Sequence, residues 1–164
     1  MRLSGNTVLI TGGTSGIGAA FAEKFLQAGS KVIITGRREE RLKKFQEDHP
    51  EMVVKTSDVA DEKQRVALAQ WVIETYPETN ILINNAGVQL LTDLKKPVDL
   101  HRVRQETETN FIAPVHLTSL FTQHLAMKQN AAIVNISSGL AFVPIAIMPV
   151  YCATKAAIHS LTLS

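Results

Sequence analysis

Short runs of apolar, often β-branched residues alternate along the chain with longer segments in which apolar residues recur at helical spacing. The apolar runs are typical of strands buried on both faces of a parallel sheet. They cover residues 7–11, 31–35, 52–54, 81–83 and 131–136. Strands that alternate with helices predict an α/β protein with a doubly wound parallel sheet, the Rossmann fold. We expect the strands, numbered along the chain, to lie in the order 3-2-1-4-5, with helices on both faces.

A glycine-rich turn, Gly12 to Gly18, connects the first predicted strand to the first predicted helix. Its glycines would let the backbone approach phosphate oxygens, and the helix N-terminus offers unpaired N–H groups and positive dipole. The alternative is a tight turn that needs small residues only for packing. Three spaced glycines between a strand and a helix favour a pyrophosphate site. The spacing is Gly-x-x-x-Gly-x-Gly, which differs from the commoner Gly-x-Gly-x-x-Gly fingerprint.

Arginines follow the second predicted strand, where a dinucleotide site meets the adenosine ribose. NAD enzymes place Asp or Glu there, about 20 residues after the glycines, to bind the ribose hydroxyls. Gly36-Arg37-Arg38 occupies that place in this chain. An arginine binds a 2′-phosphate that an acid would repel, so the sequence favours NADP, with NAD possible. Two alternatives stay open: Arg37 stacks on adenine, or both arginines only begin the polar helix 39–48.

Polar residues also follow the third, fourth and fifth predicted strands, at the sheet edge where open α/β folds bind ligands. Asp58 could accept a hydrogen bond from an adenine amino group, or it could brace its own loop. Asn84-Asn85-Ala86-Gly87 suits a backbone that lies against a cofactor. Ser138 lacks the His and acid pattern of a serine nucleophile, so its hydroxyl is better suited to donate to a substrate oxygen.

A long helix is predicted at about residues 99–127, and it contains Asn110 four residues before Pro114. Proline cannot donate a hydrogen bond to the carbonyl four residues earlier, and its ring pushes that carbonyl away. The freed carbonyl of Asn110, together with its amide side chain, could hold an ordered water. A kinked helix whose amide faces solvent explains the pattern equally well.

Tyr151 and Lys155 are spaced to share one face of a predicted helix that begins near Pro149. A phenol ionises near pH ~10, so acid–base catalysis at neutral pH requires its ionised form to be stabilised by roughly 4 kcal/mol. One ammonium at about 4 Å supplies roughly that much. The same spacing arises by chance in roughly one such chain in eight, so the pair needs a cofactor site nearby to be meaningful.

The composition narrows the class of protein. A length of 164 residues with 45% hydrophobic residues fits one domain. A net charge of +2, with acids and bases interspersed, provides no basic surface for nucleic acid, and no apolar stretch predicts a membrane span. The single cysteine, Cys152, fits a reducing cytoplasm. The five histidines are scattered without ligand spacing, so we expect no metal site.

In this order and at these spacings, the motifs resemble those of the short-chain dehydrogenase/reductase family. They are the glycine turn, Asp58, Asn84-Asn85-Ala86-Gly87, Asn110, Ser138 and Tyr151-x-x-x-Lys155. Within the family the chain is similar to small bacterial oxidoreductases associated with teichoic-acid D-alanylation genes. The family's domain usually continues further, so we expect residues 1–164 to form a single NAD(P)-binding Rossmann domain without its C-terminal strands and substrate lid.

The resemblance implies a role for each matching residue. Tyr151 would be the general acid/base, Lys155 would tune it and bind the nicotinamide ribose, and Ser138 would hold the substrate oxygen. Asn110 would carry a water that connects Lys155 to solvent. The cofactor would contact Gly12, Thr14, Ser15, Gly16, Ile17, Gly18, Arg37, Asp58, Val59, Asn85, Ala86, Gly87, Tyr151 and Lys155.

The sequence therefore predicts a cytoplasmic oxidoreductase that transfers hydride between NADP(H) and a small carbonyl or alcohol substrate. One alternative is an NAD(P)-dependent epimerase or dehydratase, although such enzymes usually carry the other glycine spacing. A second alternative is a nucleotide-binding regulator without catalysis, against which the intact set of motif residues argues. The family resemblance also implies a homodimer or homotetramer packed through the Asn110 helix and the tyrosine helix.

Overall fold

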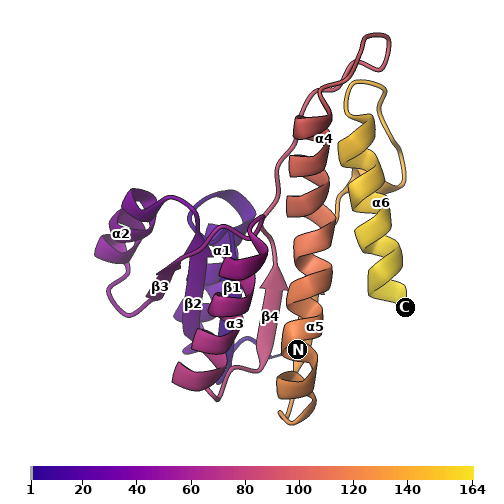
Figure 1. The fold of residues 1–164 in the computed structure, drawn as a ribbon. Coiled ribbons are helices and arrows are strands. Elements are labelled where there is room, and N and C mark those ends of the chain that lie inside the picture. Colours follow the sequence, from indigo (N-terminus) through magenta and orange to yellow (C-terminus); the bar gives the residue numbers. More distant parts are fainter. Residues whose placement is uncertain (1) are drawn as a thin grey trace.

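A parallel five-stranded sheet forms the centre of the molecule (Figure 1). The computed structural model describes residues 2–164. The strands are β1 (Thr7–Thr11), β2 (Lys31–Gly36), β3 (Val53–Thr56), β4 (Ile81–Asn84) and β5 (Ala132–Asn135). Their order is β3-β2-β1-β4-β5, and all neighbouring strands are parallel. The predicted fold class and strand order are confirmed.

Helices connect the strands and cover both faces of the sheet. They are α1 (Gly16–Gln27), α2 (Glu39–Asp48), α3 (Glu62–Thr75), α4 (Leu100–Thr107), α5 (Ala113–Ala126) and α6 (Pro149–Leu163). A π-helical turn, η1 (Glu108–Ile112), lies between α4 and α5, and a 3₁₀ turn, η2 (Gly139–Ala141), follows β5. The helix expected at residues 99–127 is thus present, and Figure 1 shows it as one continuous column made of three segments.

The π-helical turn occurs where the proline was expected to disturb the helix. Pro114 has no N–H to donate to the Asn110 carbonyl. The N–H of Ala113, next to it, donates to the carbonyl of Glu108, five residues back. The chain therefore accommodates the proline by widening one turn, a form that often marks functional sites, instead of by a sharp kink.

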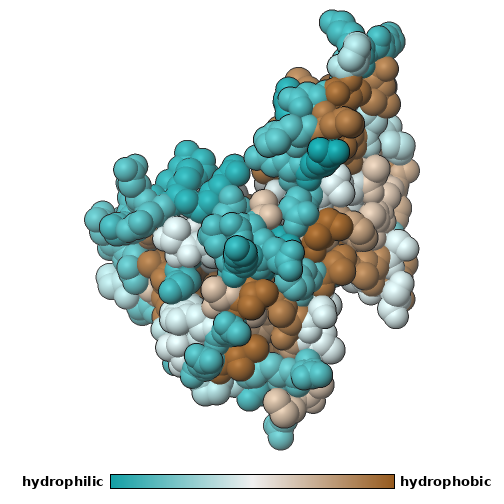
Figure 2. Space-filling view, in the orientation of Figure 1, coloured by the Kyte–Doolittle hydropathy of each residue, from teal (hydrophilic) through white to brown (hydrophobic). Residues whose placement is uncertain are grey.

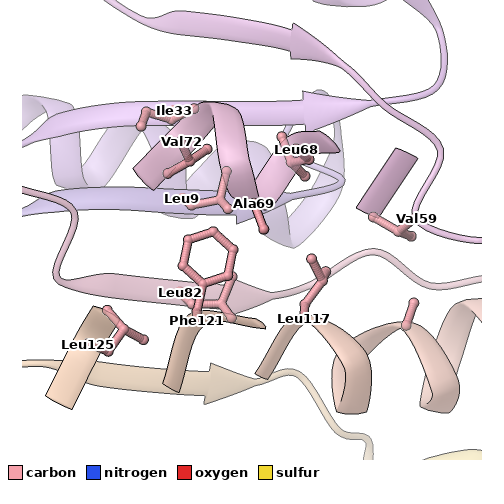
Figure 3. Close-up of a cluster of buried hydrophobic side chains, with 11 residues drawn as sticks. Leu9, Ile33, Val59, Leu68, Ala69, Val72, Leu82, Leu117, Phe121 and Leu125 are labelled. Atoms are coloured by element: carbon pink, nitrogen blue, oxygen red, sulfur yellow. The ribbon is translucent and has the colours of Figure 1, made fainter. Parts of the chain in front are cut away.

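Two apolar cores lie on opposite faces of the sheet, because successive residues of each strand point to opposite sides. On one face Leu9 and Leu82 pack against α3 and α5, and Figure 3 shows them beside Val72 and Phe121. On the other face Val8, Ile10, Val32, Ile34, Ile81 and Ile83 pack against Phe25 of α1 and Leu42 of α2. Strands β1, β2 and β4 are buried almost throughout, as their near-continuous apolar sequences predict.

The side of the molecule formed by α4, α5 and α6 carries many exposed apolar side chains. Strand β5 is hydrogen-bonded only to β4, and each of its residues is half-buried. Exposed apolar side chains include Leu100, Ile112, Met127, Phe142 and Leu163. Figure 2 shows apolar residues, in brown, gathered along this side. Within residues 2–164 no helix combines the length and apolar character needed to cross a lipid bilayer.

Candidate active site

A cleft of about 370 Å³ lies at the edge of the sheet where the strands end. Segments that follow β1, β2, β3, β4 and β5 line it, together with part of α6. The predicted site residues that line it are Gly12, Thr14, Ser15, Ile17, Arg37, Asp58, Val59, Asn85, Ala86, Gly87, Tyr151 and Lys155. The other predicted residues, Gly16, Gly18, Asn110 and Ser138, lie outside this lining. Most of the residues selected from sequence therefore converge on one cleft.

The glycines of the turn after β1 serve different purposes. A Cβ on Gly12 would approach the Ala86 Cα to 2.9 Å, and a Cβ on Gly18 would overlap the Gly12 carbonyl oxygen. At these two positions the close packing of the turn leaves no room for a larger residue. Gly16 has a φ of +56°, and no atom lies within 4 Å of the position of its missing Cβ. Its glycine is needed for backbone conformation at the start of α1.

The N-terminus of α1 presents the unpaired N–H groups that an anion requires. Ser15 precedes the helix without capping it through its side chain, and the first turn contains no acidic residue. Ser15 and Ile17 both line the cleft. Unpaired N–H groups and the positive end of the helix dipole fit a phosphate group at this position. The packing and phosphate explanations of the glycine turn are therefore compatible.

Asn85 braces the glycine turn with its side chain. Its Nδ2 donates to the carbonyl oxygens of Thr11 (2.9 Å) and Gly12 (3.0 Å). The Thr11 hydroxyl in turn accepts from the backbone N–H groups of Asn85 (3.1 Å) and Ala86 (3.0 Å). Thr11 is the first residue of the glycine motif that the family resemblance covers, Thr11–Gly18, but the sequence did not predict its supporting role. These hydrogen bonds hold the segment after β4 against the turn after β1.

Two arginines and one carboxylate line the end of the cleft formed by the segments that follow β2 and β3. Arg37 and Arg38 are exposed and line the cleft, and neither forms an ion pair with any other residue in the range 2–164. Arg38 also immediately precedes α2, so the helix-start interpretation describes that residue. Asp58 does brace its loop, since its Oδ1 accepts from the Ala60 N–H (3.0 Å), but it lines the cleft as well.

Lys155 and Tyr151 lie at the other end of the cleft, on α6. Lys155 is only 5% exposed, and its Nζ donates to the Ile136 carbonyl (2.7 Å). The same Nζ lies 5.7 Å from the centre of the Tyr151 ring. Burial lowers the pKa of Lys155, because a desolvated ammonium is less stable than a hydrated one. The pair predicted from helical spacing is thus a cleft-lining phenol next to a buried amine.

Asn110 is buried in η1, so the solvent-facing alternative is wrong. Its Nδ2 donates to the Val88 carbonyl (2.8 Å) and to the Thr154 hydroxyl (3.2 Å). Its Oδ1 accepts from the Val88 N–H (2.8 Å). Asn110 therefore joins the segment after β4 to α6, and places Gly87 close to both the Asn110 Oδ1 and the Lys155 Nζ.

The two serines after β5 have separate contacts. Ser138 caps η2, where its Oγ accepts from the Leu140 N–H (3.1 Å). Ser137 lines the cleft, and its hydroxyl donates to the Lys155 carbonyl (2.9 Å). Sequence reasoning selected Ser138 and overlooked Ser137, since two adjacent serines after a strand carry no signal that separates them.

The remaining lining residues were also not selected from sequence. They are Thr35, Gly36, Arg38, Ser57, Val88, Gln89, Thr109, Ile136 and Ser137. Most of them border a predicted residue in the chain, so a wider window around each motif would have included them.

Comparisons with known proteins agree with this geometry. The family model described as short chain dehydrogenase matches residues 6–164. All of the chain is 51% identical to the "Uncharacterized oxidoreductase DltE" of Bacillus subtilis (strain 168), of which it spans 66%. Over 94% of the chain, the identity is 36% to "Sulfoacetaldehyde reductase 2" of Chromohalobacter salexigens, of which it spans 63%. The chain thus spans slightly under two thirds of these relatives' length.

A solved structure of similar fold is that of a short chain dehydrogenase/reductase from Burkholderia phymatum in complex with NAD. It matches 99% of the chain with a TM-score of 0.92 and 28% identity, and the chain covers 59% of it. A short-chain dehydrogenase from Streptomyces avermitilis matches with a TM-score of 0.91 and 30% identity, and the chain covers 60% of it. A family model that matches nearly every residue, over a cleft where the predicted motifs meet, shows that this chain belongs to the short-chain dehydrogenase family.

Proposed function

We propose that the protein is an NADP(H)-dependent oxidoreductase that interconverts a carbonyl group and an alcohol. One observation carries this proposal: a phenol and a buried amine, Tyr151 and Lys155, share a cleft with a glycine turn and two arginines that form no ion pair within residues 2–164. This combination supports proton transfer at one end of the cleft and a dinucleotide along the rest of it. The printed names of the relatives, an oxidoreductase and an aldehyde reductase, support the same reaction class.

The donor set of the cleft fits a dinucleotide. The N–H groups of Ser15 to Ile17 at the start of α1 would bind the pyrophosphate, where Gly16 leaves its surroundings open. Asp58 and Val59 would border the adenine, and Ala86 and Gly87 would lie along the chain of the cofactor. When bound, the cofactor supplies or accepts a hydride at nicotinamide C4.

The cleft favours NADP because of Arg37. A guanidinium that is exposed at the adenosine end and engaged by no acid can bind a 2′-phosphate with two charge-assisted hydrogen bonds. A relative 31% identical to this chain, from Haemophilus influenzae, is named "Probable NADP-dependent dehydrogenase". The Burkholderia structure contains NAD, so membership of the family does not by itself select NADP, and the proposal rests on Arg37.

The proton moves at the Tyr151 oxygen. In the reduction, the phenol donates its proton to the substrate carbonyl oxygen, and in the oxidation it takes the proton from the alcohol. The Lys155 ammonium stabilises negative charge on the phenol oxygen and would also bind the nicotinamide ribose. Ser138 keeps its hydroxyl hydrogen available for the substrate oxygen, because its Oγ is an acceptor in the η2 cap. The Asn110 turn would hold the water that returns a proton to Lys155.

The substrate class is a small aldehyde, ketone or alcohol, and the assembly is a homodimer or homotetramer. The side of the cleft that faces the substrate is bordered by two segments that contact each other. The Thr92 N–H donates to the Ile147 carbonyl (3.1 Å). The residues around these contacts, 89–98 and 139–148, would determine which carbonyl compound reaches Tyr151.

Oxidation of NADPH in the presence of a panel of small aldehydes and ketones tests the proposed function. We expect oxidation that depends on the added carbonyl compound, and faster with NADPH than with NADH. An epimerase would show no net change in NADPH, and a non-catalytic regulator would bind the nucleotide without oxidising it. Nucleotide binding without any turnover across the panel would contradict the proposed reaction.

A further inference from the structure

Arg65 is a buried cation that the proposed reaction does not use. Arg65 is 2% exposed and lies on the inward face of α3, with the buried residues Leu68, Ala69 and Val72. A buried charge costs free energy, and apolar residues of similar size often replace buried ion pairs without loss of stability. The position of Arg65 therefore calls for an explanation other than core packing.

The guanidinium joins the loop between β3 and α3 to both η1 and α5. Its Nη1 donates to the Val59 carbonyl (2.6 Å), in the loop between β3 and α3, and to the Glu108 carboxylate (2.7 Å), in η1. Its Nε donates to the Nδ1 of His116 (3.1 Å), in α5. The planar fork of an arginine suits three acceptors in fixed directions, which a lysine cannot match.

The contact with Val59 reaches the cleft. Val59 is buried and lines the end where the adenine is proposed to bind. The neighbouring backbone is held from within the same loop and helix: the Asp58 N–H donates to the Gln64 side chain (2.8 Å), and the Ala60 N–H to Asp58. Arg65 adds the hydrogen bonds that fix this wall of the cleft to the neighbouring η1 and α5, through Glu108 and His116.

We propose that Arg65 is a positioning residue for the nucleotide: by anchoring the Val59 carbonyl to Glu108 and His116, it fixes the adenosine end of the cleft. This inference rests on the proposed function, because it takes the cleft to bind a dinucleotide. Arg65 itself does not touch the ligand. Its loss should weaken binding of the adenosine half, and the chemical step at Tyr151 should continue once the site is saturated.

The test compares Arg65→Met with the unmutated protein, using ADP as a probe of the adenosine half common to NADH and NADPH. We expect Arg65→Met to weaken ADP and NADPH binding by the same factor, about tenfold, in calorimetric titrations. The turnover rate at saturating NADPH should stay within about twofold. Because the Glu108 side chain is 34% exposed, water can solvate its carboxylate in the variant, which favours folding. Glu108→Gln is a second, milder variant that keeps an acceptor and should weaken ADP binding by about fivefold.

His124→Leu is the matched control. Like Arg65, His124 is a buried polar residue, but it lies on α5. Its Nε2 forms a hydrogen bond with the Thr79 carbonyl (2.9 Å), in the loop before β4 and away from the cleft. We expect this variant to keep ADP affinity within about twofold. Equal ADP affinity in Arg65→Met and the unmutated protein, or an equal loss in His124→Leu, would overturn this inference alone. Failure of the unmutated protein to bind either ADP or NADPH would overturn it together with the proposed function.

Discussion

At the scale of single residues, Arg37 connects one side chain to the choice of cofactor. Its guanidinium lines the cleft, at the end proposed to bind adenosine, without an acidic partner in the part of the chain that the structure describes. A side chain that is free before the ligand arrives does not have to break an existing ion pair to bind a phosphate. The full interaction with a 2′-phosphate is therefore available for discrimination.

Arg37→Asp should reverse the preference between the two nicotinamide cofactors. A charge-assisted contact contributes about 1.5–3 kcal/mol, so the unmutated protein should bind NADPH roughly ten- to a hundredfold more tightly than NADH. Fluorescence titration with both nucleotides measures this directly. Arg41→Asp is the control, since Arg41 is exposed on α2 and does not line the cleft. Equal affinities in the unmutated protein would show that Arg37 does not discriminate between the two cofactors.

Glu106 links the stability of the fold to pH. It is fully buried, its Oε1 accepts from the Leu90 N–H (2.9 Å), and its Oε2 has no hydrogen-bond partner within residues 2–164. Burial raises the pKa of Glu106 above its ordinary value of 4.5. Between that value and the raised pKa, the unfolded chain has lost the proton that the folded chain still holds. The free energy of unfolding therefore falls as the pH rises through this range.

Glu106→Gln should remove this dependence, because the amide keeps an acceptor for Leu90 and cannot ionise. We expect the variant to gain stability over the unmutated protein as the pH rises from 4.5. Urea unfolding at a series of pH values from about 4 to 8 gives the comparison. A stability difference that stays constant across the series would show that Glu106 does not titrate in this way.

At the scale of secondary-structure elements, the turn η1 shows what the sequence could predict and what it could not. Pro114 predicted a disturbance at Asn110, and it occurs there. Its form depends on tertiary partners: the Asn110 side chain is held by Val88 and Thr154, from segments far away in the chain. A sequence pattern reports the missing N–H of a proline but not which distant groups lie opposite the freed turn.

Asn110→Leu tests the function of this turn. The change leaves the N–H and the carbonyl of Val88 without their partners, which costs about 1–3 kcal/mol of the free energy of unfolding. Turnover should fall further than nucleotide affinity does, since the segment from Gly87 to Val88 lies next to Lys155. Chemical denaturation and steady-state rates check the two effects. The exposed Gln105→Leu, one turn earlier, should change neither quantity.

The same distinction separates the predicted elements from the predicted contacts. Strand and helix positions followed from local patterns of apolar residues. At the start of α3, the Asp61 side chain caps the helix by accepting from the Gln64 N–H (3.1 Å). The Gln64 side-chain oxygen, however, accepts a hydrogen bond from the Asp58 N–H and so supports a loop that lines the cleft. The buried Arg65 beside it was not foreseen, because its partners Glu108 and His116 belong to another helix.

At the scale of the whole molecule, the parallel sheet brings the carboxyl ends of its five strands to one edge. Residues from Gly12 to Lys155 therefore meet in one cleft. The strand order was predictable from the alternation of strands and helices. The apolar side formed by α4 to α6 was not predicted residue by residue, since exposure depends on how those helices pack. It is the surface on which the proposed dimer would form (Figure 2).

Ile112→Glu should weaken the proposed dimer. Ile112 is 40% exposed on η1, within the column proposed to pack against a second copy, and a charge there would be buried in the interface. Analytical ultracentrifugation of the protein should show a shift toward the monomer. Leu3→Glu, at an exposed apolar position near the N-terminus, is the control and should leave the assembly unchanged. Identical sedimentation of the Ile112 variant and the unmutated protein would place the interface elsewhere.

The proton-transfer role of Tyr151 is the central claim, and the two tyrosines of the chain allow a matched measurement. Tyr151→Phe removes only the phenol oxygen from the cleft, whereas Tyr76→Phe makes the same change where a tyrosine packs against Trp71. Turnover of NADPH with a reactive aldehyde should fall by about 10²–10⁴-fold in Tyr151→Phe, with NADPH affinity within about twofold of the unmutated value. Tyr76→Phe should retain its turnover. Full turnover in Tyr151→Phe would contradict the account.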